Sequence, residues 1–289
     1  MVISLRALFE PLFETLFERM HAAPLPAPSR PFSACSGPPT FAPPLSLPQT
    51  SPVPYANDSA RHQAWAWQML RRLRAYFWLK AFGITVFMGL FFVGYFHTLR
   101  NPVRPVLQMP LTALDLAIGH QPAALLAYVS LWVYVGFAPG MFHQLRHLVV
   151  YGLWAAALCS TGLLIFYLAP TAVPPYRASI DLLQHPGFAI LQGVDAAGNA
   201  CPSLHVATAL FSAVWTARFL QHIGAPLWAR LVNWLWLALI VYSTLAIKQH
   251  VVLDVVAGVA LGGAFAWASL RWFPRQVWLP MAGEPGRAR

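Results

Sequence analysis

The strongest constraint on the fold is a series of long apolar runs that fills the second part of the chain. Each run approaches the ~20 residues that a helix needs to cross ~30 Å of hydrocarbon. Backbone amides inside a bilayer must be hydrogen-bonded within the protein, so runs of this length are expected to be helices. The sequence therefore predicts an all-α integral membrane protein, a six-helix bundle. The predicted crossings are 76–97, 122–142, 147–169, 203–223, 226–247 and 250–269.

The composition of the chain agrees with a membrane location. Of 289 residues, 58% are hydrophobic and only 10% are charged, which is too few charges for an ordinary water-soluble surface. The formal net charge of +10 suits anionic lipid headgroups. Nucleic-acid binding would require basic clusters interleaved with aromatic residues on a soluble face, and the sequence has none. We therefore expect membrane lipids, and no nucleic acid, as partners.

The N-terminal part of the chain differs from the membrane region. Residues 1–21 repeat Leu-Phe-Glu at a spacing of four, which predicts an amphipathic helix, although Pro11 weakens it. Membrane docking and a nonfunctional extension both remain open for this segment. Residues 22–60 are rich in proline and predict a disordered linker. The predicted membrane domain is 61–273, followed by a tail at 274–289.

The basic residues predict how the bundle is oriented. Six crossings place both termini on one side of the membrane, and most arginines fall on that side. Positive loops favour the cytoplasm, so we expect cytoplasmic termini in a bacterial inner (cell) membrane. The arginines on that side are Arg61, Arg71, Arg72, Arg74, Arg146, Arg218, Arg230, Arg271, Arg275, Arg287 and Arg289, whereas the opposite face has Arg100, Arg104, Arg177 and Lys248.

Six residues are expected to meet at the extracytoplasmic face, and Arg177 and Lys248 are two of them. Crossing four begins there with Ser203 and His205, and crossing six begins there with His250 and Asp254. The polar loop 170–202 lies on the same side. Ionisable groups at or in a membrane are costly to place, so they are functional candidates by default.

The types of these residues favour phosphoryl transfer. Ser203 occupies an N-cap position, where open amides and the helix dipole attract anions such as phosphate. His250 and Asp254 are four residues apart, so the carboxylate can orient the imidazole and leave its other nitrogen as a nucleophile. His205 is then placed to act as the general acid. A histidine at a helix end is more often a packing residue, but an unpaired Asp254 inside the hydrocarbon boundary would cost several kcal/mol.

Two motifs resemble those of the type 2 phosphatidic acid phosphatase (PAP2) and vanadium haloperoxidase superfamily. Residues 201–205, Cys-Pro-Ser-Leu-His, resemble its PSxH motif, and residues 243–254 resemble its SRx5HxxxD motif. The resemblance covers about 122–270 and implies a six-helix membrane phosphatase or phosphotransferase that requires no metal or other cofactor. It implies that His250 is the nucleophile that forms a phosphohistidine and that Ser203 binds phosphate.

The sequence also departs from the family pattern. Thr244 stands where the motif usually has arginine, and Leu204 stands where it usually has glycine, although the backbone N–H of Leu204 remains a phosphate-binding candidate. The usual first motif, KxxxxxxRP, is absent. The Pro-rich segment 167–177 instead resembles inositol-phosphorylceramide-synthase-like and sphingomyelin-synthase-like members. We expect Arg177 to replace the missing cation; Lys248 is a second candidate, but it requires an irregular turn before His250.

These features leave three interpretations of the function. The first is a phosphatase that hydrolyses a lipid phosphate or pyrophosphate, and the second is a lipid phosphotransferase. The third is a non-catalytic lipid-binding membrane protein. The sequence does not identify the lipid, because pockets for different lipid tails are built from similar apolar side chains.

A pair of histidines outside these motifs has a spacing that can bind metal. His143 and His147 form HxxxH between crossings two and three, next to Arg146. The neighbouring arginine favours a headgroup-facing role, so we predict no metal site in the protein.

Overall fold

The computed structural model describes residues 58–174 and 198–273. All of them belong to one compact unit, Tyr55–Arg289. The predicted N-terminal helix at 1–21, most of the linker 22–60, the tail at 274–289 and Arg177 lie outside the described residues. Helix α2 begins at Asp58, slightly before the predicted start of the membrane domain.

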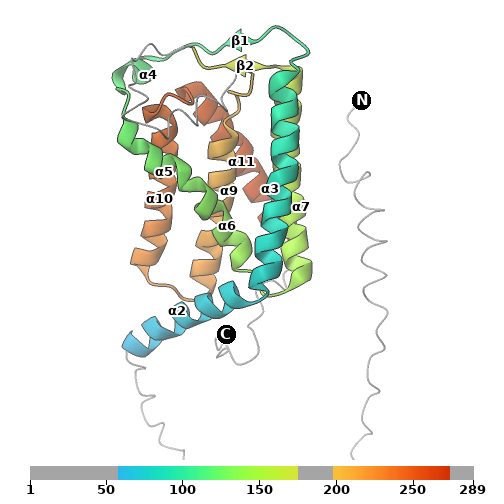
Figure 1. Ribbon diagram of the computed structural model, residues 1–289. Coiled ribbons are helices and arrows are strands. Elements are labelled where there is room, and N and C mark those ends of the chain that lie inside the picture. The colour runs from blue at the N-terminus through green and yellow to red at the C-terminus, as the bar shows by residue number, and fades with distance from the viewer. Residues whose placement is uncertain (1–57, 175–197, 274–289) are drawn as a thin grey trace, which may run out of the picture. The chain divides into compact units, whose positions relative to one another are not determined.

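The described part of the chain is an all-α membrane fold (Figure 1). Five of its helical segments are long and apolar enough to cross a membrane, and they match five of the six predicted crossings. They are α3 (Phe77–Arg100), the segment Pro122–Gly140, α7 (Leu145–Leu168), α10 (Leu227–Ala246) and α11 (Val252–Trp272).

The predicted second crossing is a broken helix rather than a continuous one. It consists of a 3-10 turn η1 (Pro122–Ala124), α5 (Leu125–Val129) and α6 (Leu131–Gly140). The break is at Ser130, whose hydroxyl donates to the carbonyl oxygen of Ala127 at 2.7 Å. Serine hydroxyls that bond to the preceding turn compete with the helical pattern. The break turns α5 away from the axis of α6 (Figure 1).

The predicted fourth crossing differs from the others in its surroundings. It forms α9 (Leu204–His222), which is not among the five helices that are apolar enough to span by themselves. Helix α9 packs against α6, α7, α10 and α11. More than half of its residues are buried, and these include Ser212 and Thr216. A helix enclosed by other helices can carry such polar residues because it does not face lipid.

Helices α9 and α11 approach each other closely at two glycines. A Cβ atom at Gly258 would lie 2.5 Å from the carbonyl oxygen of Ser203, and one at Gly262 would lie 2.4 Å from that of Ala207. Both distances are too short for any side chain. The sequence spacing of Gly258, Gly262 and Gly263 predicts close helix packing, and it is present at Gly258 and Gly262, where backbones approach as they do in GxxxG helix pairs. It also brings the starts of the two helices together.

Short irregular segments cover the end of the bundle where α9 and α11 begin. Strand β1 (Leu107–Gln108) pairs in parallel with β2 (Thr171–Ala172), and α4 (Ala113–Ala117) follows β1. As the sequence predicted, residues 105–120 do not form a crossing. Figure 1 shows these segments above the helix ends.

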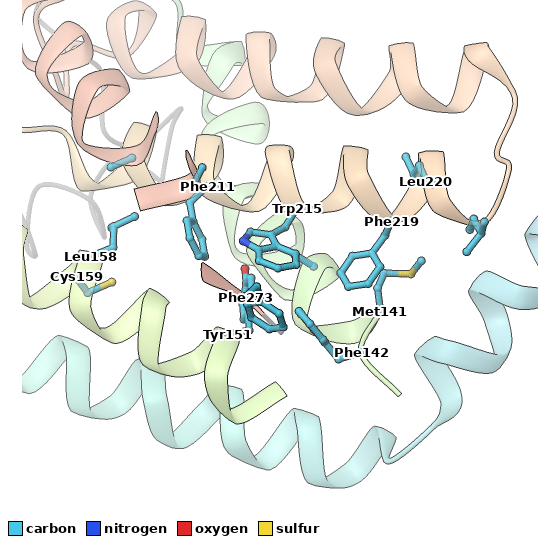
Figure 2. Packing of buried hydrophobic residues seen from close by; sticks show 14 of the residues in the cluster. Met141, Phe142, Tyr151, Leu158, Cys159, Phe211, Trp215, Phe219, Leu220 and Phe273 are labelled. Carbon is cyan, nitrogen blue, oxygen red and sulfur yellow. The ribbon is translucent and has the colours of Figure 1, made fainter. Parts of the chain in front are cut away.

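An aromatic core fills the opposite half of the bundle. Figure 2 shows Trp215 of α9 among rings from other elements, including Phe142, Tyr151 and Phe273. The indole N–H of Trp215 donates to the hydroxyl of Ser269 at 2.9 Å, so its buried polar atom is satisfied. His147 lies beside this core with its ring 5.9 Å from that of Phe273. It is almost fully buried, so the predicted headgroup-facing role is wrong for His147.

Candidate active site

The start of α9 is built around the buried Ser203. Its hydroxyl oxygen accepts from the backbone N–H of Val206 at 3.2 Å, as an N-cap residue does. Its backbone N–H donates to the carbonyl oxygen of Asp254 at 3.0 Å, which joins the start of α9 to the first turn of α11. The hydroxyl hydrogen is not used by the capping bond. Ser203 therefore sits where a ligand at this helix start would meet it.

The turn between α10 and α11 fixes the backbone of His250. Lys248 has a φ of 62°, and its N–H donates to the carbonyl oxygen of Leu245. The N–H groups of Gln249 and His250 both donate to the carbonyl oxygen of Thr244 at 3.1 Å. These bonds form a Schellman motif with a lysine at the left-handed position that usually holds glycine. The irregular turn that Lys248 would require to act as a phosphate ligand is present.

His250 faces the carboxylate that the spacing predicted. Its Nδ1 lies 3.5 Å from Oδ2 of Asp254, and the Asp254 side chain is fully buried. The same carboxylate oxygen accepts from the backbone N–H of Val251 at 3.0 Å. Asp254 thus caps α11 and faces the imidazole at once. Nδ1 of His250 and Oδ1 of Asp254 make no hydrogen bond to any described residue, so a small movement would let the pair close.

His205 is held by an aromatic ring and a carbonyl from α5. Its ring stacks on Tyr128 with centroids 4.0 Å apart and planes 11° from parallel. Its Nε2 lies 3.1 Å from the carbonyl oxygen of Tyr128. A carbonyl only accepts, so Nε2 carries a hydrogen and Nδ1 is the nitrogen that can exchange a proton. The edge of Trp132 also faces the imidazole, with ring centroids 6.4 Å apart.

The two histidines lie at the same end of the bundle. His205 lies in the first turn of α9 and His250 lies directly before α11, and the hydrogen bond from Ser203 to Asp254 joins these two helix starts. One ring is presented by α9 and the other by the turn before α11, and the glycine contact holds these elements together. The arrangement places two imidazoles and a carboxylate beside a hydroxyl-capped helix start.

Asp115 fastens residues 107–118, which we call the covering segment, to α11. This role was not predicted from the sequence. Oδ1 of Asp115 accepts from the backbone N–H of Val252 at 2.8 Å, and its Oδ2 accepts from the N–H and hydroxyl of Thr112. Burial raises the pKa of Asp115, but these bonds and the Lys248 charge outweigh it, so its pKa is lowered from 3.8. The capping box of Thr112 and Asp115 was visible in the sequence, whereas its contact with Val252 was not.

Lys248 bonds to the covering segment through its ammonium group. Nζ donates to the carbonyl oxygen of Asp115 at 2.8 Å and to that of Ile118. At the motif position of the family arginine, Thr244 is fully buried, and its hydroxyl donates to the carbonyl oxygen of Val241. Through these contacts, Lys248 joins the turn before α11 to the covering segment.

Other reactive groups near the site do not add a nucleophile. Burial, reinforced by the charge of Asp254, raises the pKa of the Cys201 thiol to about 11, so it stays protonated at neutral pH. The backbone N–H of Cys201 donates to the hydroxyl of Thr171 at 2.8 Å. Within residues 58–174 and 198–273, no cluster of three or more histidine, cysteine or acidic residues is arranged to hold a metal ion.

Comparison with known proteins locates a family in the second half of the chain. Residues 149–278 match the family model described as the PAP2 superfamily. The matched range contains Ser203, His205, His250 and Asp254, whereas Tyr128 and Asp115 precede it. No curated protein and no solved structure matches the chain. Residues 149–278 are thus similar to the PAP2 superfamily.

Proposed function

We propose that the protein is a membrane lipid phosphatase that hydrolyses a lipid phosphate or pyrophosphate through a phosphohistidine intermediate. The observation that carries the proposal is the pairing of His250 with Asp254 at 3.5 Å, next to His205 at the start of α9. The family match and the membrane-spanning helices support a phosphatase-type enzyme of the membrane.

In the first step, the substrate phosphate binds against the hydroxyl-capped start of α9. Ser203 and the backbone N–H of Leu204 are its proposed ligands. Asp254 faces Nδ1 of His250, so Nε2 is the nitrogen that attacks phosphorus. The bond from phosphorus to the lipid oxygen breaks, and protonated His205 gives the proton on Nδ1 to that oxygen. The lipid alcohol leaves, or the lipid monophosphate when the substrate is a pyrophosphate.

In the second step, water releases the phosphoryl group. Neutral His205 takes a proton from water while the water oxygen attacks phosphorus, and the bond to Nε2 of His250 breaks. Inorganic phosphate leaves, and His205 is again protonated. Asp254 stabilises the positive charge on His250 that this step discharges. The sum of both steps is hydrolysis of one phosphate ester or anhydride bond.

A lipid phosphotransferase is the second candidate. The feature that favours it is the motif position of Thr244, where a buried hydroxyl replaces the guanidinium that clamps phosphate. The Pro-rich segment 167–177 favours it as well. In a transferase, an acceptor hydroxyl replaces water in the second step. We also propose that the site faces the extracytoplasmic side, with Arg177 as an additional phosphate ligand.

Phosphate release by the purified protein tests the proposal. The substrates are labelled phosphatidic acid, a sphingoid phosphate and a polyprenyl pyrophosphate in mixed micelles. We expect free phosphate from wild-type protein, near-complete loss in His250→Ala and severe loss in His205→Ala. His97→Ala is the matched control, because His97 is exposed in α3 and belongs to neither motif.

Each outcome separates the candidates. Label in free phosphate indicates hydrolysis, whereas label in a new phospholipid with an added acceptor indicates transfer. A denaturing quench at alkaline pH should trap label on wild-type protein that is stable in base and released by acid, and it should trap none on His250→Ala. If lipid binding is intact while every substrate is left unchanged, the protein is a non-catalytic lipid-binding protein and the phosphatase proposal is wrong.

A further inference from the structure

Helix α2 (Asp58–Arg74) has a position unlike that of the spanning helices. It lies across the end of the bundle opposite the candidate site, where α9 ends and α10 begins (Figure 1). It is not among the helices that are apolar enough to cross a membrane. A helix of this kind, with an apolar side and a basic side, is typical of the membrane interface.

One face of α2 is fastened to the bundle. Trp65 is buried and meets Trp228 of α10 with ring centroids 5.7 Å apart. Leu73 packs against Gly140, leaving no room for a side chain there. The fully buried Arg72 contacts Nδ1 of His143 at 3.1 Å, and its carbonyl oxygen accepts from Nζ of Lys80 at 2.7 Å. These contacts fix the rotation of α2 about its axis.

The other face of α2 is directed away from the bundle. We define this outer face by Trp67, Leu70, Arg71 and Arg74, which recur at the spacing of one helical side. Trp67 is 57% exposed and Leu70 is 41% exposed. The guanidinium of Arg71 lies over the Trp67 ring at 4.7 Å, which holds this charge beside an aromatic surface. The outer face therefore combines large apolar groups with positive charge.

The residues after α2 continue the same surface. Tyr76, Phe77, Trp78 and Leu79 are all about half exposed or more, at the point where α3 begins to cross the bilayer. Exposed tryptophan and tyrosine at the end of a spanning helix are typical of the headgroup level. The outer face of α2 is continuous with this level, so the surface of the bilayer itself is the partner that fits it.

We propose that the outer face of α2 is a binding surface for anionic phospholipid headgroups. Arg71 and Arg74 supply the charge, while Trp67 and Leu70 enter the boundary between headgroups and acyl chains. Residues 65–80, which are described, include no acidic residue, so the charge of the outer face complements lipids such as phosphatidylglycerol. The inference does not depend on the proposed phosphatase activity.

Lipid selectivity of the full-length protein tests the inference. The protein is reconstituted in phosphatidylcholine vesicles, and the association of spin-labelled phosphatidylglycerol is compared with that of spin-labelled phosphatidylcholine. We expect wild-type protein to prefer phosphatidylglycerol. The double substitution Arg71→Gln and Arg74→Gln should lower this preference at least about fivefold at low salt. Raising the salt concentration should reduce the preference of the wild type in the same direction.

Two further variants make the result decisive. The conservative pair Arg71→Lys and Arg74→Lys keeps both charges and should keep the preference. The pair Arg100→Gln and Arg104→Gln removes two exposed charges at the other end of α3, and Arg100 also lies over an aromatic ring, that of Phe96 at 5.5 Å. This control should leave the preference unchanged. An unaltered preference in the α2 glutamine pair, or an equal fall in the control pair, overturns the inference and favours a protein partner or a terminal segment of the chain as the occupant.

Discussion

Two helix starts lie side by side at the candidate site, and they are capped in opposite ways. At the start of α11, the backbone N–H groups of Val251 and Val252 donate to the carboxylates of Asp254 and Asp115. At the start of α9, the capping group is the neutral hydroxyl of Ser203, and no carboxylate of the described residues bonds to its first turn. A negatively charged cap already satisfies the positive end of a helix dipole.

This difference predicts that the two helix starts interact differently with an anion. The carboxylate-capped α11 repels an anion at its amides, and its beginning instead orients His250. The hydroxyl-capped α9 keeps its positive end available for a phosphate. The contact at Gly258 holds the two helix starts close together.

The largest effect is expected from removing the charge of Asp254. Asp254→Asn keeps an oxygen that can accept from Val251, so α11 remains capped. It removes the negative charge beside His250, and we expect kcat to fall by roughly two to four orders of magnitude. Steady-state kinetics with a circular dichroism check measures this. Activity near the wild-type level would mean that Asp254 is only a helix cap.

The next effect comes from making the two helix starts alike. Ser203→Asp places a carboxylate at the start of α9, while Ser203→Asn is a neutral cap of nearly the same size. We expect the aspartate variant to lose roughly a hundredfold more kcat/KM than the asparagine variant, because the charge repels phosphate. The pair shares any steric cost of a larger side chain. Equal losses in the two variants would contradict a phosphate site at α9.

A smaller effect is expected from releasing the covering segment. Asp115→Ala removes the acceptor for Val252 and for Thr112, and it should lower the free energy of unfolding by about 1–3 kcal/mol. Thermal unfolding in detergent measures the loss. Asp115→Asn, which retains acceptor oxygen, should lose less. No change in either variant would show that the segment is held by other contacts.

The same carboxylate predicts how stability depends on pH. The pKa of Asp115 is lowered from 3.8, so its stabilising contribution is present above this value and is lost as pH falls through the lower folded-state pKa. We expect the unfolding temperature of the wild type to decline below about pH 4 more steeply than that of Asp115→Asn. Parallel curves for the two proteins would contradict this account.

The smallest effect on catalysis is expected at Lys248. Its ammonium donates to the carbonyl oxygens of Asp115 and Ile118, so Lys248→Met should lower stability by about 1 kcal/mol and change KM only severalfold. A phosphate ligand would instead raise KM strongly. A large rise in KM with unchanged stability would show instead that Lys248 binds the substrate phosphate.

Much of the fold could be predicted because hydropathy and short-range spacing determine it. The helix of each crossing, the N-cap at Ser203 and the spacing of His250 and Asp254 are all properties of neighbouring residues. The contact at Gly258 and Gly262 was also visible as a small-residue pattern. These features depend on local geometry, which sequence periodicity describes well.

The rest depends on which distant segments meet. Nothing near Tyr128 in the sequence indicates that its ring and carbonyl hold His205, which lies 77 residues later in the chain. The bond from Val252 to Asp115 likewise joins residues that are 137 positions apart. Hydropathy also does not reveal that His147 points into an aromatic core instead of towards headgroups.

The modest hydropathy of α9 has a consequence for biogenesis. A segment with this many polar residues gains little from entering lipid alone, since each hydroxyl favours water until neighbouring helices surround it. Its stable insertion therefore waits for α10 and α11, which are made later on the ribosome. His205 and His250 come together only when the last helix docks, so the proposed site requires the complete bundle.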